Sequence, residues 1–335
     1  ELAHAPPADL SIELAAVVDI NPSRATRVAQ QVGTRAFTSV AELLAGENIH
    51  AASVAVPTTE HLAVAHAIMQ AGIDVLIEKP LAPSLAEADE LIATARRTGR
   101  VAQVGHLERF NPAVRAAVPL ITQPMFFEVH RLSVFTRRAL DVDVVLDLMI
   151  HDLDIVLAFV GSPVKEVRAV GLPILSGKVD IANVRMEFDS GCVANFTASR
   201  VSTERVRKLR FFQPRQYISI DYTRQDVLVF TVEPSASLAA DPALLERPAQ
   251  AQAPTAQQVP HAGLPIRVEK PATQHEEPLR AELRSFLEAV RQRSAPLISL
   301  EDGRRALALA LEVLEKIREH SRRLNLESLN AVRPR

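Results

Sequence analysis

Cysteine is almost absent from this sequence, and long apolar runs are missing. The one cysteine among 335 residues, Cys192, excludes a disulfide framework within the chain and a cysteine-bound metal cluster. It also suits a reducing compartment, so we expect a cytoplasmic protein. No apolar run reaches the roughly 20 residues that a membrane helix needs. The best candidate, residues 142–160, is interrupted by four aspartates and a histidine, so we expect no membrane partner.

An excess of charge of either sign is missing too, and glycine is scarce. The formal net charge is −2 at pH 7, which argues against a general attraction to nucleic acid. Charged residues make up 23% and hydrophobic residues 47% of the chain, as in an ordinary globular protein. Its length favours about two domains. Only 11 residues are glycine, a share well below the usual ~7%, and the first of them is Gly33.

The first hundred residues alternate apolar runs with amphipathic stretches. The apolar runs that predict strands cover residues 13–18, 51–56, 73–77 and 101–104. The helix signals between them are Asn21 before Pro22, the capping-box pairs Ser39/Glu42 and Ser84/Glu87, and the stops Gly33, Gly72 and Gly99. Strands separated by helices at this spacing imply βαβ units, and we expect a Rossmann-type parallel sheet.

Beyond about residue 120 the pattern changes, because strand signals follow one another without intervening helices. They cover residues 125–132, 164–170, 181–188, 192–199, 217–222 and 226–232, with helix signals at 142–160, 279–293 and 301–318. Residues 234–278, rich in Pro, Ala and Gln, predict a long loop. We therefore expect an α/β Rossmann-type domain over residues 1–110 and an α+β domain with an open, mainly antiparallel sheet over residues 111–335.

The most prominent chemical signal is Glu78-Lys79-Pro80, directly after the strand predicted at 73–77. Ligands of parallel α/β sheets bind beyond the carboxyl ends of the strands, which is where this lysine falls. Acid–base work near neutral pH would require its pKa, ordinarily about 10.4, to be lowered to roughly 7–8. Taken alone, the position suits a solvated lysine better.

A second signal is the pair Asp147 and His151, which are four residues apart on one predicted helix. This spacing puts both side chains on one face, and a carboxylate beside an imidazole can orient it for general base catalysis. An ion pair on the helix surface, or a histidine at a domain interface, explains the pair equally simply. Without cysteine partners these residues form no closed zinc set, so we expect no metal.

Two further strand ends carry polar residues. Asp19 ends the first strand signal, where the acid of a dinucleotide-binding sheet hydrogen-bonds the ribose 2′-hydroxyl. An ordinary acid before a helix is the alternative. Pro57, Thr58 and His61 follow the strand signal at 51–56, where hydroxyls and backbone amides at a helix start suit a polar ligand. A simple helix cap suits this position equally well.

Three segments, in this order and spacing, resemble the Gfo/Idh/MocA family, which contains glucose–fructose oxidoreductase, inositol dehydrogenase and relatives. They are PTTEH at 57–61, DVLIEKPLA at 74–82 and LDLMIHDLDI at 146–155, and the resemblance covers nearly the whole chain. It implies an NAD-dependent enzyme that oxidises a sugar hydroxyl, with Lys79, Asp147 and His151 as catalytic residues. The cofactor-binding residues that it implies are Asp19, Pro57, Thr58, His61, Glu78 and Lys79.

A narrower resemblance points to the branch of the family that contains the UDP-N-acetylglucosamine 3-dehydrogenases, whose 3-keto product is later aminated for amide-linked lipid A. It rests on VGHLERFNPAV at 104–114, EVHRLSVFTRRALDVDVVLDLMIHDLDIV at 128–156, STERVRKLRFFQ at 202–213 and YISIDY at 217–222. The substrate-binding residues would be His106, Arg109, Asn111 and Arg131. The basic run from Arg200 to Arg215 could hold a pyrophosphate, although a charged strand face or a subunit contact is favoured. The family resemblance also implies a homodimer or homotetramer.

The sequence departs from the family at its start. The family opens with a strand and a G-x-G-x-x-G turn about 20 residues before the ribose-binding acid. Here 18 residues precede Asp19, and none is glycine. A normal enzyme whose first strand lies upstream explains this better than a protein without cofactor, because a missing central strand leaves interior ladder groups unpaired. A dehydrogenase of another sugar or inositol, a cofactor-sensing regulator and a cofactor-free scaffold are the alternatives.

Overall fold

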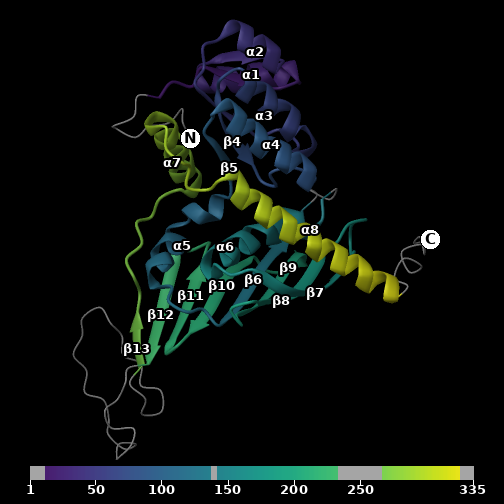
Figure 1. The fold of residues 1–335 in the computed structure, drawn as a ribbon, viewed down its shortest axis with the longest axis vertical. Coiled ribbons are helices and arrows are strands. Elements are labelled where there is room, and N and C mark those ends of the chain that lie inside the picture. The colour runs from purple at the N-terminus through teal and green to yellow at the C-terminus, as the bar shows by residue number, and fades with distance from the viewer. Residues whose placement is uncertain (1–11, 137–141, 233–265, 325–335) are drawn as a thin grey trace, which may run out of the picture. The chain divides into compact units, whose positions relative to one another are not determined.

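Contacts divide the chain into two compact units (Figure 1). The computed structural model describes residues 12–136, 142–232 and 266–324. The first unit consists of Glu1–Phe110 and Glu276–Ala308, and the second of Asn111–His275 and Leu309–Arg335. Each unit is described by itself below.

The first unit contains parallel strands with helices between them. Its elements are β1 (Ala16–Val18), α1 (Pro22–Val32), β2 (Arg35–Phe37), α2 (Val40–Gly46), β3 (Ala51–Val54), the 3₁₀ turn η1 (Thr58–Glu60), α3 (His61–Gln70), β4 (Asp74–Glu78), α4 (Leu85–Thr98), β5 (Ala102–Gly105), the 3₁₀ turn η2 (Leu107–Phe110), α7 (Pro278–Gln292) and the start of α8 (Leu300–Arg323). β1 pairs with β2, and β4 lies between β3 and β5, always in parallel. The predicted Rossmann-type parallel sheet is confirmed. Among the described residues no strand joins β1 to β3, the place of the first strand in a Rossmann-type sheet.

The helices of this unit begin and end at the predicted caps. The side chains of Asn21, Ser39 and Ser84 accept hydrogen bonds from backbone N–H groups in the first turns of α1, α2 and α4. Gly33 and Gly99 follow α1 and α4 in the left-handed region, at φ 71° and 63°. Local sequence therefore determines these helix ends. β2 and η1 were not predicted, because three residues carry too little pattern.

Helix α7 packs on the parallel sheet, which corrects the expected domain division. We expected every residue after 110 in the second domain, whereas residues 276–308 belong to the first unit. Phe286 and Ala289 of α7 form one buried cluster with Leu76 of β4 and with Val101, which immediately precedes β5. The apolar face of an amphipathic helix is satisfied by any apolar surface, so chain position alone did not reveal which unit it covers.

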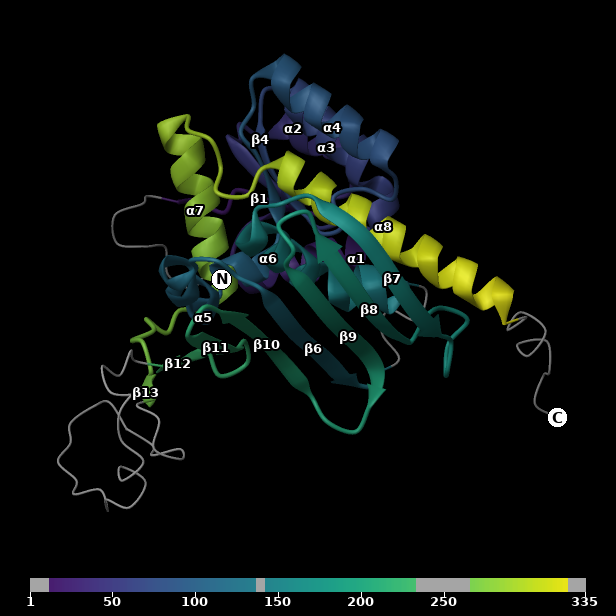
Figure 2. The same ribbon diagram turned by 60° about the horizontal axis from the view of Figure 1, so that its bottom comes forward.

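The second unit is built on one broad, open sheet (Figure 2). Its elements are α5 (Pro112–Ala117), the 3₁₀ turn η3 (Val118–Leu120), β6 (Phe126–Val134), the π-helical turn η4 (Val145–Met149), α6 (Ile150–Val160), β7 (Val164–Leu172), β8 (Ile181–Phe188), β9 (Val193–Ser202), β10 (Val206–Gln213), β11 (Gln216–Asp221), β12 (Asp226–Val232) and β13 (Ile266–Glu269). The strand order is β13-β12-β11-β10-β6-β9-β8-β7, with only the β6–β9 pair parallel. The mainly antiparallel sheet is thus confirmed. Phe127 and Phe211 face its covered side, where Phe159 of α6 meets Phe211 at a centroid distance of 5.9 Å.

Three details of this unit differ from the sequence prediction. Strand β10 was missed, because its sequence VRKLRFFQ was interpreted as a basic run. Strand β13 lies inside the stretch predicted as a loop, of which residues 234–265 fall outside the described residues. The single helix predicted at 142–160 is instead a π-helical turn followed by an α-helix. Pairing with distant strands stabilises β10 and β13, and a local pattern does not contain that information.

Candidate active site

The Glu78-Lys79-Pro80 segment continues the central strand of the three-stranded sheet. β4 is buried along Asp74–Ile77 and becomes half-buried at Glu78. Leu81 and Ala82, just after the segment, are fully buried, and the Lys79–Pro80 peptide bond is cis. The chain therefore leaves the sheet through a tightly packed turn that holds Lys79 at the carboxyl end of β4, where α/β sheets bind ligands.

Glu78 is closely packed and partly desolvated. Burial raises the pKa of its carboxyl group, while the backbone and charge of Lys79 and the charge of His61 act in the opposite direction. In the sheet register Glu78 stands opposite Gly105, and a Cβ added at Gly105 would come within 3.1 Å of Glu78 Oε2. A glycine at this position of β5 therefore makes room for the glutamate.

His61 lies behind the same turn. It is 1% exposed, and its ring nitrogens face two backbone carbonyls, with Nδ1 3.2 Å from the oxygen of Leu81 and Nε2 3.0 Å from that of Val56. The imidazole thus connects the turn after β3 to the segment after Lys79. In the described structure this histidine contacts backbone from within the fold, a role that its place in PTTEH did not distinguish from ligand binding.

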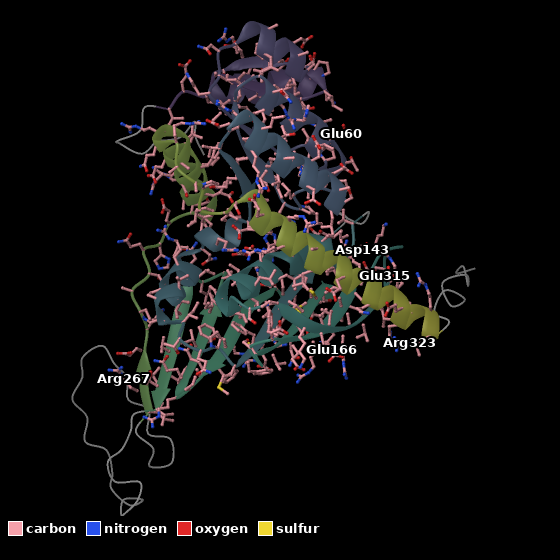
Figure 3. The ribbon with its side chains drawn as sticks, viewed as in Figure 1. Glu60, Asp143, Glu166, Arg267, Glu315 and Arg323 are labelled. Atoms are coloured by element: carbon pink, nitrogen blue, oxygen red, sulfur yellow. The ribbon has the colours of Figure 1, made fainter. Side chains whose placement is uncertain are left out.

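The turn after β3 is short and ordered by its own backbone. Pro57 and Thr58 enter η1, and the N–H of Glu60 donates to the carbonyl of Pro57 at 2.8 Å. Glu60, labelled in Figure 3, is exposed at the start of α3. The turn presents backbone and hydroxyl groups at the carboxyl end of β3, next to the strand that carries Lys79.

Asp19 follows β1 and is partly exposed. Its Oδ1 accepts from the N–H of Asn21 at 2.8 Å, and its Oδ2 lies 3.2 Å from Nη1 of Arg24. The side chains of Asp19 and Arg24 are 21% and 60% exposed, so solvent reaches this ion pair. A carboxylate in this position retains acceptor capacity for hydroxyl groups. The sequence did not single out Arg24, although its spacing of five residues from Asp19 on an exposed helix start could have suggested it.

The donors and acceptors of the first unit match parts of a dinucleotide. Asp19 offers a carboxylate to ribose hydroxyls, the Pro57–Thr58 turn offers polar groups, and Lys79 offers an ammonium at a strand end. The described residues contain no glycine-rich turn for a pyrophosphate, because the first glycine of the chain is Gly33. The polar groups present at these strand ends are of kinds that can bind hydroxyl and amide groups of a dinucleotide.

In the second unit, Asp147 lies in the π-helical turn and His151 in the first turn of α6. The N–H of Ile150 donates to the carbonyl of Val145, which is the wide i→i+5 bond of a π-turn. Four residues make about one turn in either helix geometry, so both side chains lie on one face. Both are half-buried. Turns of this kind are frequent at functional sites.

Asp143, labelled in Figure 3, lies at the start of this helical segment. Its Oδ1 accepts from the N–H of Val179 at 2.8 Å, and the N–H of Val144 donates to the carbonyl of Val179 at 2.9 Å. Its own carbonyl accepts from the N–H of Asp147 at 3.0 Å. The position of Asp147 is thereby tied to the segment that precedes β8.

Two predicted substrate-binding residues are engaged inside the second unit. Arg131 is 3% exposed and makes a bidentate ion pair with Asp152, with Nε–Oδ2 and Nη2–Oδ1 distances of 2.6 and 2.9 Å. Its guanidinium also lies 5.0 Å from the ring centroid of Tyr222. Asn111 is buried, donates to the carbonyl of Tyr222 at 3.0 Å and accepts from the N–H of Ala113. These contacts hold β6, α5 and α6 together.

The other two predicted substrate-binding residues belong to the first unit. His106 follows β5 and is 1% exposed, and Arg109 lies in η2. Burial opposes the ionisation of Asp302, but hydrogen bonds from Ser299 and Arg305, and then the charge of Arg109, lower its pKa. Both residues thus lie beyond the carboxyl end of β5, the neighbour of the strand that carries Lys79.

The basic run is paired with acids of the same unit. Arg210 lies 2.8 Å from Glu128, Lys208 3.9 Å from Asp221, and Arg200 3.7 Å from Asp180. Such pairs fit the charged strand face that we favoured for this run. In the part of the chain that the structure describes, no cluster of three or more His, Cys, Asp or Glu could hold a metal ion. Within the same residues, every helix is too short or too polar to span a bilayer.

Comparison with known proteins agrees with this arrangement. Residues 2–106 match the family described as "Oxidoreductase family, NAD-binding Rossmann fold", and residues 114–219 match the "GFO/IDH/MocA C-terminal domain". The chain belongs to the Gfo/Idh/MocA family of NAD-binding oxidoreductases.

The chain is similar to the UDP-N-acetylglucosamine 3-dehydrogenase of Acidithiobacillus ferrooxidans, with 36% identity over 90% of this chain and 88% of that protein. It is also similar to the myo-inositol 2-dehydrogenase of Thermotoga maritima, with 24% identity over 94% and 92% of the two chains. A solved structure of the Acidithiobacillus enzyme has a TM-score of 0.77 and 35% identity over 89% and 88% of the chains. Levoglucosan dehydrogenase in complex with NADH shares the fold, with a TM-score of 0.74 and 17% identity over 91% and 88%.

Proposed function

We propose that this chain is an NAD-dependent dehydrogenase that oxidises a secondary hydroxyl of a sugar to a ketone, with the 3-hydroxyl of UDP-N-acetylglucosamine as its target. The observation that carries this proposal is the 36% identity to a UDP-N-acetylglucosamine 3-dehydrogenase over 90% of the chain. Lys79, Asp147 and His151 are all present at their motif positions, which favours an enzyme over a cofactor-sensing regulator.

When NAD is bound, its nicotinamide supplies the hydride acceptor of such a reaction. The residues of the chain have to remove the hydroxyl proton, and the neutral Nζ of Lys79 or a ring nitrogen of His151 accepts it. Asp147, on the same helical face as His151, orients the imidazole and stabilises its charged form. Positioned proton transfer of this kind typically contributes 10²–10⁴-fold to the rate.

The cofactor would be held mainly at the strand ends of the first unit. Asp19 would bind the adenosine ribose hydroxyls and disfavour a 2′-phosphate, while Pro57, Thr58 and Glu78 would line the path toward Lys79. His61 would support the cofactor site indirectly, by contacting the backbone of the turns around it, because its ring nitrogens already face two carbonyls.

His106 and Arg109, which follow β5 in the first unit, would take part in recognising the substrate. Asn111 and Arg131 would support substrate recognition indirectly, because their side chains donate hydrogen bonds to other groups of the second unit. As Cys192 is the one cysteine, we place the enzyme in the cytoplasm, a reducing compartment.

We further propose that the chain forms a homodimer or homotetramer through the outer face of its broad sheet. A ladder of aromatic rings crosses four strands on that face, formed by Phe126, Phe212, Tyr217 and Phe230. Their centroids lie 4.9 to 5.7 Å apart in neighbouring pairs, and none of the four rings is fully buried. Exposed aromatic surface of this kind favours association.

The test is NADH formation by the purified full-length protein with UDP-N-acetylglucosamine, other nucleotide sugars, free sugars and inositols. We expect turnover of UDP-N-acetylglucosamine to exceed that of every other compound. Activity confined to substrates without a nucleotide would refute the specific substrate and leave a sugar or inositol dehydrogenase. Cofactor binding without turnover of any substrate would favour a regulator.

A further inference from the structure

Helix α7 buries one carboxyl group against the sheet that carries Lys79. Glu282 is 1% exposed, and its Oε1 has no hydrogen-bond partner among the described residues. It lies on the same face of α7 as Phe286 and Ala289, which follow it at helical spacing and pack against Leu76 and Val101. Burying an ionised carboxyl group on an otherwise apolar face costs free energy unless the group is paired, so an unpaired one keeps its proton.

The direction of α7 places Glu282 at the catalytic end of β4. Arg293, just after the end of α7, pairs with Asp74 at the start of β4. At the other end of the helix, Glu282 is close enough to Glu78 for the charge of Glu78 to act on it. The helix therefore runs antiparallel to the strand, and Glu282 lies behind the residue that immediately precedes Lys79.

The surroundings of Glu282 keep its proton in place. Burial, followed by the charges of Glu78 and Glu277, raises the pKa of Glu282 to about 8. Arg284 directs its guanidinium to Glu276 at 2.7 Å. The charged and titratable groups on the elements around α7 are Asp74, Glu78 and Lys79 of β4 and its end, His106, Glu108 and Arg109 at η2, and Glu276, Glu277, Arg280 and Arg284 of the α7 segment.

We propose that Glu282 is a positioning residue for Lys79: a buried acid on the α7 face that covers β4, which adds no negative charge behind Glu78 while it holds its proton. Glu282 is buried, and the charge of Glu78 further disfavours its ionised form, so the two carboxyl groups do not both ionise cheaply. Glu78 lies beside Lys79, which favours its ionised form, so the proton stays on Glu282.

This arrangement controls the charge that Lys79 experiences. When Glu282 ionises at alkaline pH, a second negative charge joins Glu78 and favours the ammonium form of the lysine. Below that pH, Glu282 adds no negative charge to the surroundings of Lys79, and the lysine releases its proton more readily. The consequence for catalysis rests on the proposed function, in which Lys79 exchanges a proton with the substrate hydroxyl; the charge coupling itself does not.

The experiment measures the protonation of Lys79 directly in the full-length protein. Acetic anhydride labels neutral amines, and peptide mass spectrometry reports the labelling rate of Lys79 against the exposed Lys165 from about pH 7 to about pH 11, which spans the usual lysine range. The variants are Glu282→Gln and Glu282→Met, both neutral and of similar size. Glu288→Gln, the same change on the same helix, is the matched control.

We expect the midpoint for labelling of Lys79 to fall by roughly 0.5–1 pH unit in both Glu282 variants, because they never acquire the second charge. Glu288→Gln should coincide with the unmodified protein. Coincident midpoints in all four proteins would overturn the proposal, and so would a rise in the Glu282 variants.

Activity separates this inference from the proposed function. In an active enzyme, the alkaline midpoint of the pH–rate profile should move down with the labelling midpoint in Glu282→Gln, and an unmoved profile would refute the positioning role. If the labelling shift is found but no sugar is oxidised, the proposed function fails and the coupling of Glu282 to Lys79 stands.

Discussion

Two buried carboxyl groups, one in each unit of this protein, differ in how the fold satisfies them. Asp180 of the second unit is fully buried, and burial opposes its ionisation. It nevertheless has a lowered pKa, because the Ser176 hydroxyl and the N–H groups of Ile174, Leu175 and Ser176 donate to it. Glu282 of the first unit has no such donors at Oε1, and its pKa is raised.

This difference separates structural charges from functional ones. Arg131 and Asp152 are buried together and satisfy each other, so the second unit gains a fixed geometry around the helix that carries Asp147 and His151. Glu78 and Glu282 both have a raised pKa near the end of β4, and perturbed groups of this kind typically indicate a functional site. Five predictions test this comparison, in order of decreasing expected effect.

The largest effect should come from the catalytic residues themselves. Lys79→Ala or His151→Ala should each reduce turnover by about 10²–10⁴-fold, because each removes a positioned proton acceptor. NADH formation measures turnover, and binding of NAD followed by calorimetry should remain. Turnover within a factor of two of the unmodified enzyme in both variants would mean that neither residue exchanges the proton.

The next effect concerns the satisfied pair of the second unit. Asp152→Ala leaves Arg131 buried without its carboxylate and should cost about 3–5 kcal/mol of unfolding free energy. Urea unfolding provides the measurement. The double variant Arg131→Met with Asp152→Leu is the control and should recover most of the loss. If the double variant is as unstable as the single one, the loss does not come from leaving Arg131 unpaired, and the prediction is wrong.

The pH dependence of stability should distinguish Glu282 from Asp180. Glu282 keeps its proton in the folded state up to about pH 8 but loses it near its ordinary value of 4.5 when unfolded. The unfolding free energy should therefore fall as pH rises through that window, by up to ~1.4 kcal/mol per pH unit. Glu282→Gln should abolish this decline, as urea unfolding at a series of pH values would reveal.

Asp180 should behave with the opposite sign. Its lowered pKa means that its stabilisation is present above the ordinary aspartate range and is lost as pH falls through the folded-state pKa. Asp180→Asn should weaken the acid-side loss of stability and leave the alkaline side unchanged. The same urea series tests this, and an alkaline change in Asp180→Asn would contradict the assignment.

The smallest effect should come from an exposed pair on the same sheet. Arg210 and Glu128 lie 2.8 Å apart with 38% and 35% of their side chains exposed. Glu128→Gln should change the unfolding free energy by only about 0–1 kcal/mol, because water already solvates both ions. Urea unfolding in low and high salt measures it, and a loss comparable to that in Asp152→Ala would mean that distance rather than burial sets the energy.

Much of the first unit could be predicted from the sequence because its signals are local. A cap such as Ser84 or Gly99 acts on the backbone within a few residues, so the pattern and the structure agree. The position of Lys79 at a strand end followed from the apolar run before it. The same logic failed for β10, since a strand rich in Arg and Lys forms only where neighbouring strands pair with it.

The predicted site residues show the same division. Asp147 and His151 were predicted on one face and lie on one, although the π-turn between Val145 and Met149 was not foreseen. His61 and Arg131 were predicted as ligand-binding residues from their motifs alone. The structure gives both of them partners inside the fold, which sequence spacing does not reveal.

The sequence by itself determined the alternating strands and helices, the helix ends and the family to which the chain belongs. Those features depend on residue type and short-range spacing, both of which can be read directly from one sequence. Only the tertiary structure decided that α7 covers the sheet beside Lys79 and that Glu282 is buried there without a partner for Oε1. Burial depends on which distant surfaces meet, and it is burial that changes the protonation of a carboxyl group.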